Sequence, residues 1–395
     1  MNRFRPTTAE VNLSALARNA ELIFRTLNKP DFFCPMVKAN AYGHGDLVVS
    51  KKLRSIGVKH LGVGLIEEGV HLRESGDKES ILHFGMFDRH GLREMLAQNL
   101  TPVISSLEAI ELINEEVYRS NDIQSKRAPL EVHLKINTGM NRLGIDPSVV
   151  TKAATRIGNS SGIKLTGVAT HFASGDLLSD PGSAAADQLR LFDQCISDIV
   201  KCGLSGFVKH IANSDAAAEL ASLGLSGYGA RPGLSLYGVP NPSVHSSKPF
   251  PVEPVLTLRS AIVHLQDVRQ GARVSYGGTW IANRDTRIGV IPCGYADGYR
   301  RGLAGSEILV HGQRVPIVGT ICMDYFMCDL TSVPLAKVGD EVILLGKSGS
   351  QLGSHNVTVS ELAHRLGTIP YEILTGLSER VPRLYNDDGS HISLV

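Results

Sequence analysis

The run LEVHLKI (residues 130–136) is followed by SVVTKAATRIG (148–158) and then by KLTGVATH (164–171). The first and third segments are short and mostly apolar, whereas the middle one carries its apolar residues at helical spacing. Short apolar runs that alternate with helices are typical of parallel strands buried on both faces. This strand–helix–strand unit therefore predicts an α/β protein with a parallel sheet.

Similar units extend on both sides of this one. Eight units in about 240 residues match the size of a (β/α)8 barrel of the TIM type. A doubly wound open sheet is the alternative, because units are hard to count from a single sequence. The predicted strands cover residues 32–37, 60–65, 81–86, 101–105, 130–136, 164–171, 207–212 and 228–238, and helical patterns cover 46–57, 106–120, 148–158 and 186–203.

A proline-rich stretch, PNPSVHSSKPFPVEP (240–254), ends this alternation with five prolines in fifteen residues. Proline at this density keeps the chain extended and stops helices. Beyond it, runs such as TRIGVIPCG (286–294) and DEVILLG (340–346) are rich in β-branched residues, which predicts antiparallel β structure in a small barrel or sandwich. We therefore predict a barrel domain at 1–240, a linker at 241–254 and a mainly antiparallel β domain at 255–395, with a helical patch at 358–377.

Composition and charge exclude several classes of protein. The 395 residues include 40 Lys plus Arg and 39 Asp plus Glu, so the net charge of +1 lacks the basic excess of a nucleic-acid binder. No run approaches the roughly 18 apolar residues of a membrane span, and the start of the chain has no secretory signal. The six cysteines form no CxxC pair, which argues against a metal finger or a disulfide framework. We expect a cytoplasmic protein that binds no nucleic acid, membrane or metal.

The segment MVKANAYGHG (36–45) is the first candidate site. Lys38 follows the first predicted strand, and a parallel barrel places its active site at that end of its strands. A lysine there can form a Schiff base with an aldehyde cofactor, and Tyr42 can donate a hydrogen bond to a phosphate. On residue type alone, however, a lysine in a solvated loop is the favoured interpretation of this residue.

The whole string closely resembles the pyridoxal-phosphate lysine motif of the alanine racemase family. Ordered matches from residue 36 to 383 are more specific than any single pattern. They imply the same barrel followed by a β domain, with pyridoxal 5′-phosphate as the cofactor. The further strings that resemble the family's motifs are LKINTGMNRLGI (134–145), THFASGD (170–176), ANSDA (212–216), ARPGLSLYG (230–238), VSYGGTW (274–280), IPCGYADGYRRGL (291–303), VGTICMDYFMCDLT (318–331), GDEVILLG (339–346) and YEILTGLSERVPR (371–383).

The resemblance implies catalysis by two bases, because racemisation removes a proton from one face of Cα and returns one to the other. Lys38 would hold the cofactor as a Schiff base and act as one base, and Tyr276 would act as the other. His171 would hydrogen-bond that tyrosine. Arg231 would lie behind His171 and face the pyridine nitrogen, where it disfavours the protonated ring and so suppresses transamination.

The resemblance also implies the residues that hold the cofactor and the substrate. The phosphate would be held by Tyr42, Ser214, Tyr371 and the backbone near Gly233 and Leu234, with Asn213 beside them. Lys135 takes the place of a lysine that is carbamylated in some members of the family. Arg142 would contact the phenolic oxygen of the cofactor and orient the substrate, Met323 and Asp324 would receive the substrate carboxylate, and Tyr295 and Arg301 would lie at the substrate entrance.

In this family the tyrosine and methionine equivalent to Tyr276 and Met323 reach the cofactor of the opposite subunit, so the resemblance implies a head-to-tail homodimer with shared sites. One departure is Asn137, where many members have Asp; the change removes a negative charge near Arg142 and affects substrate tolerance. We expect interconversion of L- and D-alanine, whether for D-alanine biosynthesis and the cell wall or for alanine degradation.

Three alternatives remain. The first is a racemase of serine or of broad specificity, although broad-specificity relatives usually carry a signal peptide. The second is a pyridoxal-phosphate-dependent amino-acid decarboxylase, which shares the domain plan but carries a glycine-rich loop and an EPGR-like string that this chain lacks. The third is a barrel that only binds the cofactor, and such proteins lack the β domain and therefore Tyr276.

Overall fold

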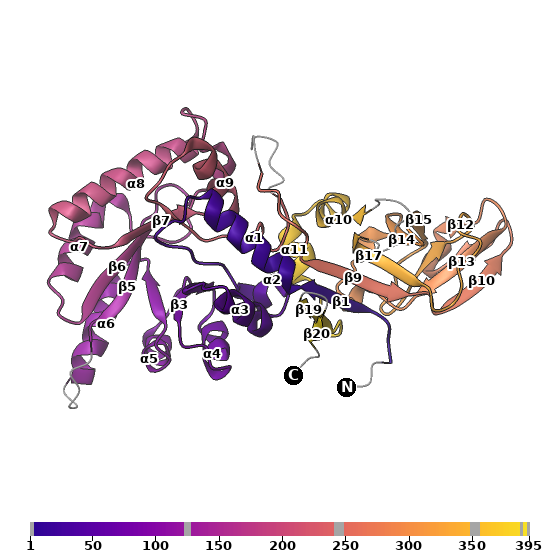
Figure 1. Cartoon of the computed structure of the whole chain (residues 1–395), viewed down its shortest axis with the longest axis horizontal. Coiled ribbons are helices and arrows are strands. Elements are labelled where there is room, and N and C mark those ends of the chain that lie inside the picture. The colour runs from indigo at the N-terminus through magenta and orange to yellow at the C-terminus, as the bar shows by residue number, and fades with distance from the viewer. Residues whose placement is uncertain (1–3, 122–127, 241–248, 348–355, 388–389, 393–395) are drawn as a thin grey trace.

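The computed structural model describes residues 4–121, 128–240, 249–347, 356–387 and 390–392. Figure 1 shows two units arranged along the longest axis of the molecule. The indigo-to-pink unit alternates strands with helices, and the orange-to-yellow unit is mainly β-structure. This arrangement confirms the predicted fold class. Residues 241–248 of the predicted linker lie outside the described residues.

The sheet of the first unit is parallel and closes on itself. Residues 32–37 lie between the two edges of a seven-stranded sheet and close it. Phe33 pairs with Ala230 of the last strand, and Met36 pairs with Gly62 of the first. The remaining seven strands follow in sequence order: β2 (His60–Val63), β3 (Ser80–His83), β4 (Thr101–Ile104), β5 (Leu130–Lys135), β6 (Ile163–Ala169), β7 (Val208–Ala212) and β8 (Gly229–Ala230). Of the predicted strand at 228–238, only its first part is extended.

Helices connect these strands and surround the sheet (Figure 1). Three of them, α4, α5 and α9, had no sequence prediction. Few positions of α4 and α5 are buried, and α4 buries only Gly69 and Leu72. In the described part of the chain, no helix combines the length and apolar character needed to cross a bilayer. The helices are α3 (Asp46–Ser55), α4 (Ile66–Glu74), α5 (Arg89–Ala97), α6 (Leu107–Asn121), α7 (Val150–Gly158), α8 (Ala184–Lys201) and α9 (Ser214–Leu223).

The second unit is built on one eleven-stranded sheet. Its path runs β10-β13-β16-β15-β14-β17-β9-β1-β19-β20, and β18 pairs with β17. Neighbours are antiparallel except β1 and β19. The strands are β1 (Thr8–Asn12), β9 (Leu256–Ala261), β10 (His264–Val268), β13 (Thr286–Ile291), β14 (Glu307–Val310), β15 (Gln313–Val318), β16 (Phe326–Asp329), β17 (Glu341–Lys347), β18 (Asn356–Val357), β19 (Arg383–Asp387) and β20 (Ser390–Ile392).

The chain begins in this second sheet before it enters the barrel. β1 pairs with β9 on one side and with β19 on the other. Helix α1 (Leu13–Thr26) follows directly, and the Asn12 side chain accepts a hydrogen bond from Ala15 N at 2.8 Å, which caps the helix. The sequence predicts no strand here, because a run of five residues that leads straight into a helix carries little periodicity of its own.

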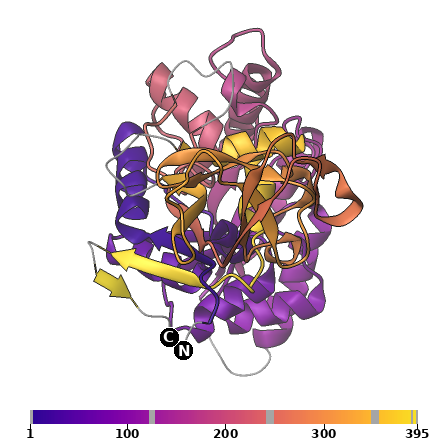
Figure 2. The ribbon, with the colours of Figure 1, turned by 90° about the vertical axis from the view of Figure 1, so that its right-hand side faces the viewer.

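The two units meet at the carboxyl ends of the barrel strands. Helix α2 (Lys38–Gly43) lies there, and Arg383 of β19 donates from Nε to the carbonyl oxygen of Gly43 at 3.0 Å. A Cβ atom on Gly43 would lie 2.2 Å from the carbonyl oxygen of Leu374 in α11 (Pro370–Thr375), so the two backbones are in close contact. Figure 2 shows the β unit in front of the barrel, with the yellow helices between the two.

Candidate active site

Lys38 stands at the start of an unusual turn. The following residues, 39–42, have φ between 51° and 54°, so they form a left-handed helical turn without glycine. A left-handed conformation costs an ordinary residue roughly 1–2 kcal/mol. The turn therefore exists only because contacts around it hold it in place.

Side chains from several elements supply those contacts. Asn40 Oδ1 accepts from Asp46 N at 2.9 Å, and Glu68 Oε1 accepts from Ala39 N at 2.6 Å. His44 is completely buried, and its Nδ1 donates to the carbonyl oxygen of Tyr42 at 2.9 Å. Burial lowers the pKa of His44 to about 4, so the ring is neutral at pH 7. These ties set the positions of both Lys38 and Tyr42.

The Lys38 amine lies among other cations. Desolvation lowers its pKa, the guanidinium of Arg142 lowers it further, Glu68 opposes the shift, and Arg231 adds to it. Lys135 on β5 is 7% exposed, and burial followed by Arg231, Arg142 and Lys38 lowers its pKa to about 8. The site therefore combines positive charge with amines that lose a proton readily, which suits an anionic ligand that reacts with amines.

Arg231 connects this site to a row of histidines inside the barrel. It is 6% exposed, and it donates from Nη1 to His210 Nδ1 at 2.9 Å and from Nη2 to His171 Nδ1 at 3.2 Å. Because a guanidinium only donates, the ring nitrogens that face it are acceptors, and each neutral ring carries its proton on Nε2. His210 Nε2 in turn donates to His133 Nδ1 at 2.7 Å.

Burial keeps these histidines neutral. Desolvation, followed by the charge of Arg231, lowers the pKa of His171 to about 2. Burial likewise lowers the pKa of His133 to about 3 and that of His210 far below its usual value. Burial also lowers the pKa of Arg231 to about 10, so its charge persists at pH 7. His171 thus presents a neutral N–H donor backed by a fixed positive charge.

Hydroxyl groups converge at the start of α9. Ser214 is its first residue, and Ser214 Oγ accepts from Gly233 N at 3.1 Å and from Ser235 N at 3.2 Å. A Cβ on Gly233 would lie 2.3 Å from Tyr42 Oη, so only glycine allows this approach. The rings of Tyr42 and Tyr371 lie 5.8 Å apart, and burial raises the pKa of Tyr371 to about 12. A helix N-terminus surrounded by protonated hydroxyls suits a phosphate.

The side chains of three predicted cofactor residues, Asn213, Leu234 and Arg142, lie outside the group of hydroxyls at the start of α9. Asn213 caps α9, because its Oδ1 accepts from Ala216 N at 2.9 Å. The side chain of Leu234 is 2% exposed and belongs to the core, so only its backbone can face a ligand. Arg142 is exposed and acts on Lys38, Lys135 and His171 through its charge. Asn137 donates from Nδ2 to Asn141 Oδ1 at 3.0 Å.

The other predicted site residues form a second group in the β unit. Tyr295 N donates to the carbonyl oxygen of Cys322 at 3.0 Å, and Ala296 N donates to that of Met323 at 3.1 Å. Thr320 Oγ1 donates to the carbonyl oxygen of Tyr276 at 3.1 Å. The side chains of this group are outward-facing: Tyr276 is 75% exposed, Met323 52% and Tyr295 42%. Asp324 follows Met323 and accepts from Arg380, and Arg301 begins the short helix η5 (Arg301–Leu303).

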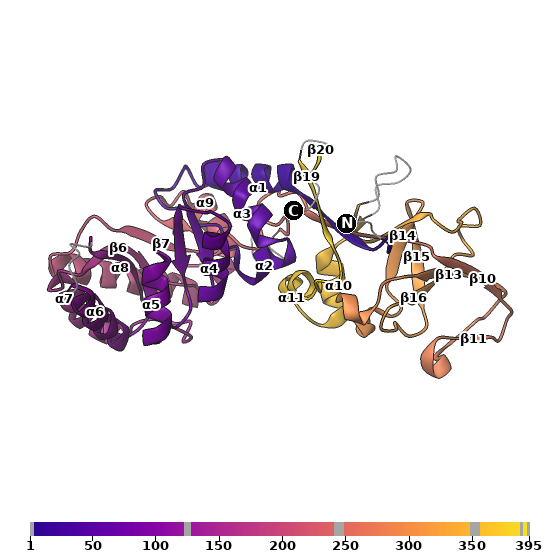
Figure 3. The ribbon, with the colours of Figure 1, turned by 90° about the horizontal axis from the view of Figure 1, so that it is seen from below.

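The two groups are apart within one chain. Among the described residues, no hydrogen bond joins Tyr276, Tyr295 or Met323 to Lys38 or His171. Tyr276 begins the short helix η3 (Tyr276–Gly278), one residue after the end of β11 (Arg273–Val274). Figure 3 shows β11 at the end of the β unit that is remote from the barrel.

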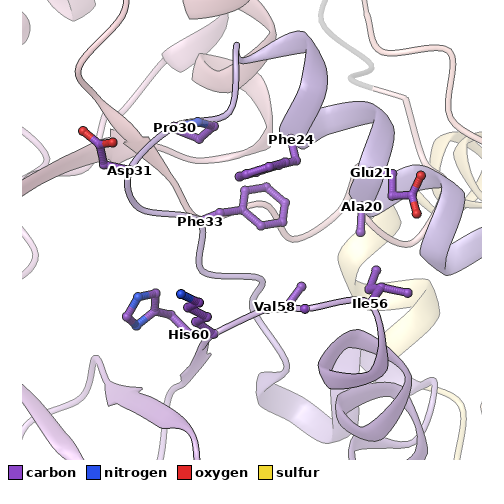
Figure 4. A pocket seen from close by; sticks show the side chains of 11 residues that line it. Ala20, Glu21, Phe24, Pro30, Asp31, Phe33, Ile56, Val58 and His60 are labelled. Carbon is purple, nitrogen blue, oxygen red and sulfur yellow. The ribbon is translucent and has the colours of Figure 1, made fainter.

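A pocket of about 260 Å³ lies elsewhere on the barrel (Figure 4). Phe24 and Phe33 line it, together with His60, the first residue of β2. It therefore opens at the amino ends of the strands, opposite to Lys38. Barrel enzymes react at the carboxyl ends of their strands, so the pocket is not the candidate active site. In the described part of the chain, no cluster of three His, Cys, Asp or Glu side chains is placed to hold a metal ion.

Sequence reasoning missed several residues of the site. His133 and His210 lie within predicted strands, and the signal that could have found them is a histidine inside a buried, otherwise apolar strand. Thr170 was not among the predicted site residues, although its carbonyl oxygen accepts from Arg231 Nη2 at 2.8 Å. Glu68 carried no sequence signal, because one glutamate among several on a helix is usually a solvated side chain.

Comparison with known proteins places these residues in a family context. Residues 11–241 match the family model described as alanine racemase, N-terminal domain, and residues 255–385 match alanine racemase, C-terminal domain. A protein named alanine racemase from Sorangium cellulosum is 37% identical over 390 residues, which cover 97% of this chain and 100% of the relative.

Solved structures give the same result. An alanine racemase structure from Clostridium difficile 630 superposes with a TM-score of 0.88 at 32% identity, and covers 99% of this chain and 98% of that one. The crystal structure of alanine racemase from Bacillus anthracis with bound L-Ala-P has a TM-score of 0.87 at 29% identity, with 100% and 98% covered.

Proposed function

The chain belongs to the alanine racemase family, and we propose that it interconverts L-alanine and D-alanine with pyridoxal 5′-phosphate held at the carboxyl ends of the barrel strands. The observation that carries the proposal is the position of Arg231, which bonds two neutral histidines and whose charge helps to lower the pKa of the Lys38 amine. This arrangement matches the roles that a racemase needs: an amine for the aldehyde, a donor for the ring nitrogen and a neutral histidine for the second base.

The residues present fit the cofactor. Ser214, Tyr42 and the amides that follow Gly233 would hold the phosphate at the start of α9, and Gly233 keeps that space open. Arg231 is available to donate to the pyridine nitrogen, and Arg142 to the phenolic oxygen. When bound, the cofactor would withdraw electrons from Cα of the attached amino acid and make its proton acidic.

The residues of the chain would then move the proton. Lys38 Nζ, whose pKa is lowered by desolvation and by Arg142, would take the proton on one face of Cα. Tyr276 Oη would return a proton on the opposite face. His171 supports this role, because its Nε2–H is directed by Arg231 and can stabilise a tyrosine oxygen that has lost its proton.

We propose that Tyr276 acts in the site of a second copy of the chain, in a head-to-tail homodimer. Within one chain it is 75% exposed and is not bonded to His171. Met323 and Tyr295 lie on the same exposed loops, so one contact would bring all three to the partner's site. Met323 and Asp324 would receive the substrate carboxylate there, and Tyr295 and Arg301 would line the entrance.

Lys135 is a candidate for carbamylation. Formation of a carbamate needs a neutral amine, and burial with three nearby cations lowers the pKa of this lysine to about 8. The same cations, Arg231, Arg142 and Lys38, would then stabilise the negative charge of the product. Arg142 would be oriented by that carbamate. We also propose a cytoplasmic location, which the six unpaired cysteines of the described chain support.

The test of the function is turnover of a panel of amino acids with added pyridoxal phosphate. L-Alanine is expected to racemise faster than L-serine, L-lysine or L-arginine, and no CO2 is expected from any of them. Faster turnover of another amino acid would contradict the substrate assignment, and release of CO2 would favour the decarboxylase. Lys38→Ala should lose the Schiff-base absorbance and lower kcat/KM by about 100-fold or more, whereas the exposed Lys51→Ala should keep both.

A further inference from the structure

The charged groups that act on the Lys38 amine are positive, with one exception. Arg142 and Arg231 both lower the pKa of its amine, and Lys135 is close enough to be affected by the charge of Lys38. Among the described residues that shift the pKa of Lys38, Glu68 is the one that raises it. The function proposed above gives this carboxylate no role.

Glu68 divides its two carboxylate oxygens between two elements. Oε2 accepts from Gly64 N at 2.8 Å and from Leu65 N at 3.1 Å, which caps the first turn of its own helix, α4. Oε1 reaches across to α2 and accepts from Ala39 N at 2.6 Å. The helix cap needs only one oxygen, so the second bond ties α4 to the residue directly after Lys38.

The same carboxylate lies beside the stem of Lys38. A Cβ on Gly64 would be 3.5 Å from Lys38 Cδ and 3.7 Å from Glu68 Oε2, so both side chains pass over the same glycine. His83, at the end of β3, holds Gly64 in place beneath these two side chains: it is 1% exposed and hydrogen-bonds the backbone of Gly64. The position of Glu68 is therefore set by packing as well as by its own bonds.

We propose that Glu68 is a positioning residue for Lys38: it holds the first residue of the left-handed turn and presents the carboxylate that faces the Lys38 amine. The inference rests on the proposed role of Lys38 as the cofactor lysine. The turn has a strained backbone. Loss of the hydrogen bond from Ala39 N to Glu68 would therefore let Lys38 move away from the place of the cofactor ring. Loss of the charge would leave the amine among Arg142, Arg231 and Lys135 alone.

The experiment compares Glu68→Gln with Glu67→Gln. Glu67 is an exposed neighbour on the same helix turn, and no hydrogen bond or ion pair joins its side chain to α2 among the described residues, so it is the matched control. Two readouts are independent of racemisation: the pH dependence of the rate at which apoenzyme forms a Schiff base with pyridoxal phosphate, and hydrogen exchange of the amides of residues 38–43. The neutral amine is the reactive form, so the first readout reports the protonation of Lys38.

Glu68→Gln is expected to move the midpoint of the pH profile down by about one unit, because an anion near an amine favours its protonated form. Exchange at residues 38–43 should become faster, and kcat should fall about tenfold while KM changes less than twofold. Glu67→Gln should match the wild type in every measurement. A Glu68→Gln enzyme whose pH profile and exchange equal those of Glu67→Gln would overturn the proposal.

Glu68→Asp provides the second variant if Glu68→Gln does not fold. It keeps the charge and a helix-capping carboxylate, but its side chain is too short to serve both elements. It should therefore keep the pH midpoint and increase exchange at residues 38–43, and unchanged exchange would refute the backbone tie. A wild-type enzyme that takes up pyridoxal phosphate without racemising alanine would contradict the proposed function and leave these two readouts of Glu68 intact.

Discussion

Arg231 is the residue that we propose directs the reaction toward racemisation. It is buried, yet all its bonds go to neutral acceptors: Nη1 donates to the carbonyl oxygen of His210 at 2.7 Å and Nη2 to that of Thr170 at 2.8 Å. No carboxylate shares its charge among these partners. A cofactor nitrogen that faces this group would meet a donor and a positive charge, so it would stay unprotonated.

Arg231→Glu is expected to raise transamination relative to racemisation by roughly an order of magnitude, because a carboxylate favours the protonated pyridine ring and a stronger withdrawal of electrons. The measurement is pyruvate formed per alanine racemised, together with conversion of the bound aldehyde to the amine form of the cofactor. Arg231→Lys keeps a donor and the charge, so it should keep the low ratio. An unchanged ratio in a folded, cofactor-loaded Arg231→Glu enzyme would refute this role.

At the scale of elements, the candidate phosphate cradle depends on contact between α2, α9 and the loop after β8. Tyr42 comes from the left-handed turn, Ser214 from the start of α9, and Gly233 from the loop. The ring of Tyr42 also stacks on Tyr237 at 4.9 Å, so it has little room to retreat. The spacing among the three elements is therefore set by a residue without a side chain.

Gly233→Ala is expected to weaken pyridoxal phosphate binding about tenfold or more and to destabilise the protein by about 1–3 kcal/mol, because the new methyl group would overlap Tyr42 Oη. Equilibrium titration of apoenzyme and thermal unfolding measure the two effects. In Gly233→Ala/Tyr42→Phe the overlap with Oη is removed and a closer-than-normal approach of 2.8 Å to Cζ is left, so stability should recover in part while cofactor affinity stays low. A single variant with normal stability and affinity would contradict the proposed cradle.

At the scale of the whole molecule, the predicted site residues fall into two groups on two units. Lys38, His171 and Arg231 belong to the barrel, and Tyr276 and Met323 belong to exposed loops of the β unit. Tyrosine and methionine are enriched in protein interfaces, so exposed side chains of these two types on neighbouring loops suit such an interface. Both groups can act in one reaction if a second copy brings them together.

Complementation between two inactive variants tests this assembly. Lys38→Ala and Tyr276→Phe subunits, unfolded and refolded together, should recover about a quarter of the wild-type activity, since half of the dimers would be mixed and each would contain one intact site. Each variant refolded alone gives the background. Activity that stays at this background, although mixed dimers are isolated, would show that both residues act within one chain.

Much of the architecture and chemistry could be predicted from the order of residues along the chain. The apolar runs at β2 to β7 and the helices α6, α7 and α8 are local patterns, so their periodicity is visible without a structure. Lys38 was likewise predictable, because its position after a strand is a property of the sequence. The short β1, by contrast, becomes a strand only by pairing with β9 and β19, which lie more than two hundred residues away.

Tertiary structure decided the remaining features, because they depend on atoms that are distant in sequence. The left-handed turn at 39–42 runs against local preference and persists because Glu68, His44 and Arg383 hold it. The neutral state of the barrel histidines follows from their burial around Arg231, and this burial cannot be seen in the sequence. Motifs therefore predicted the candidate reacting groups, and packing between the elements set their positions and their protonation states.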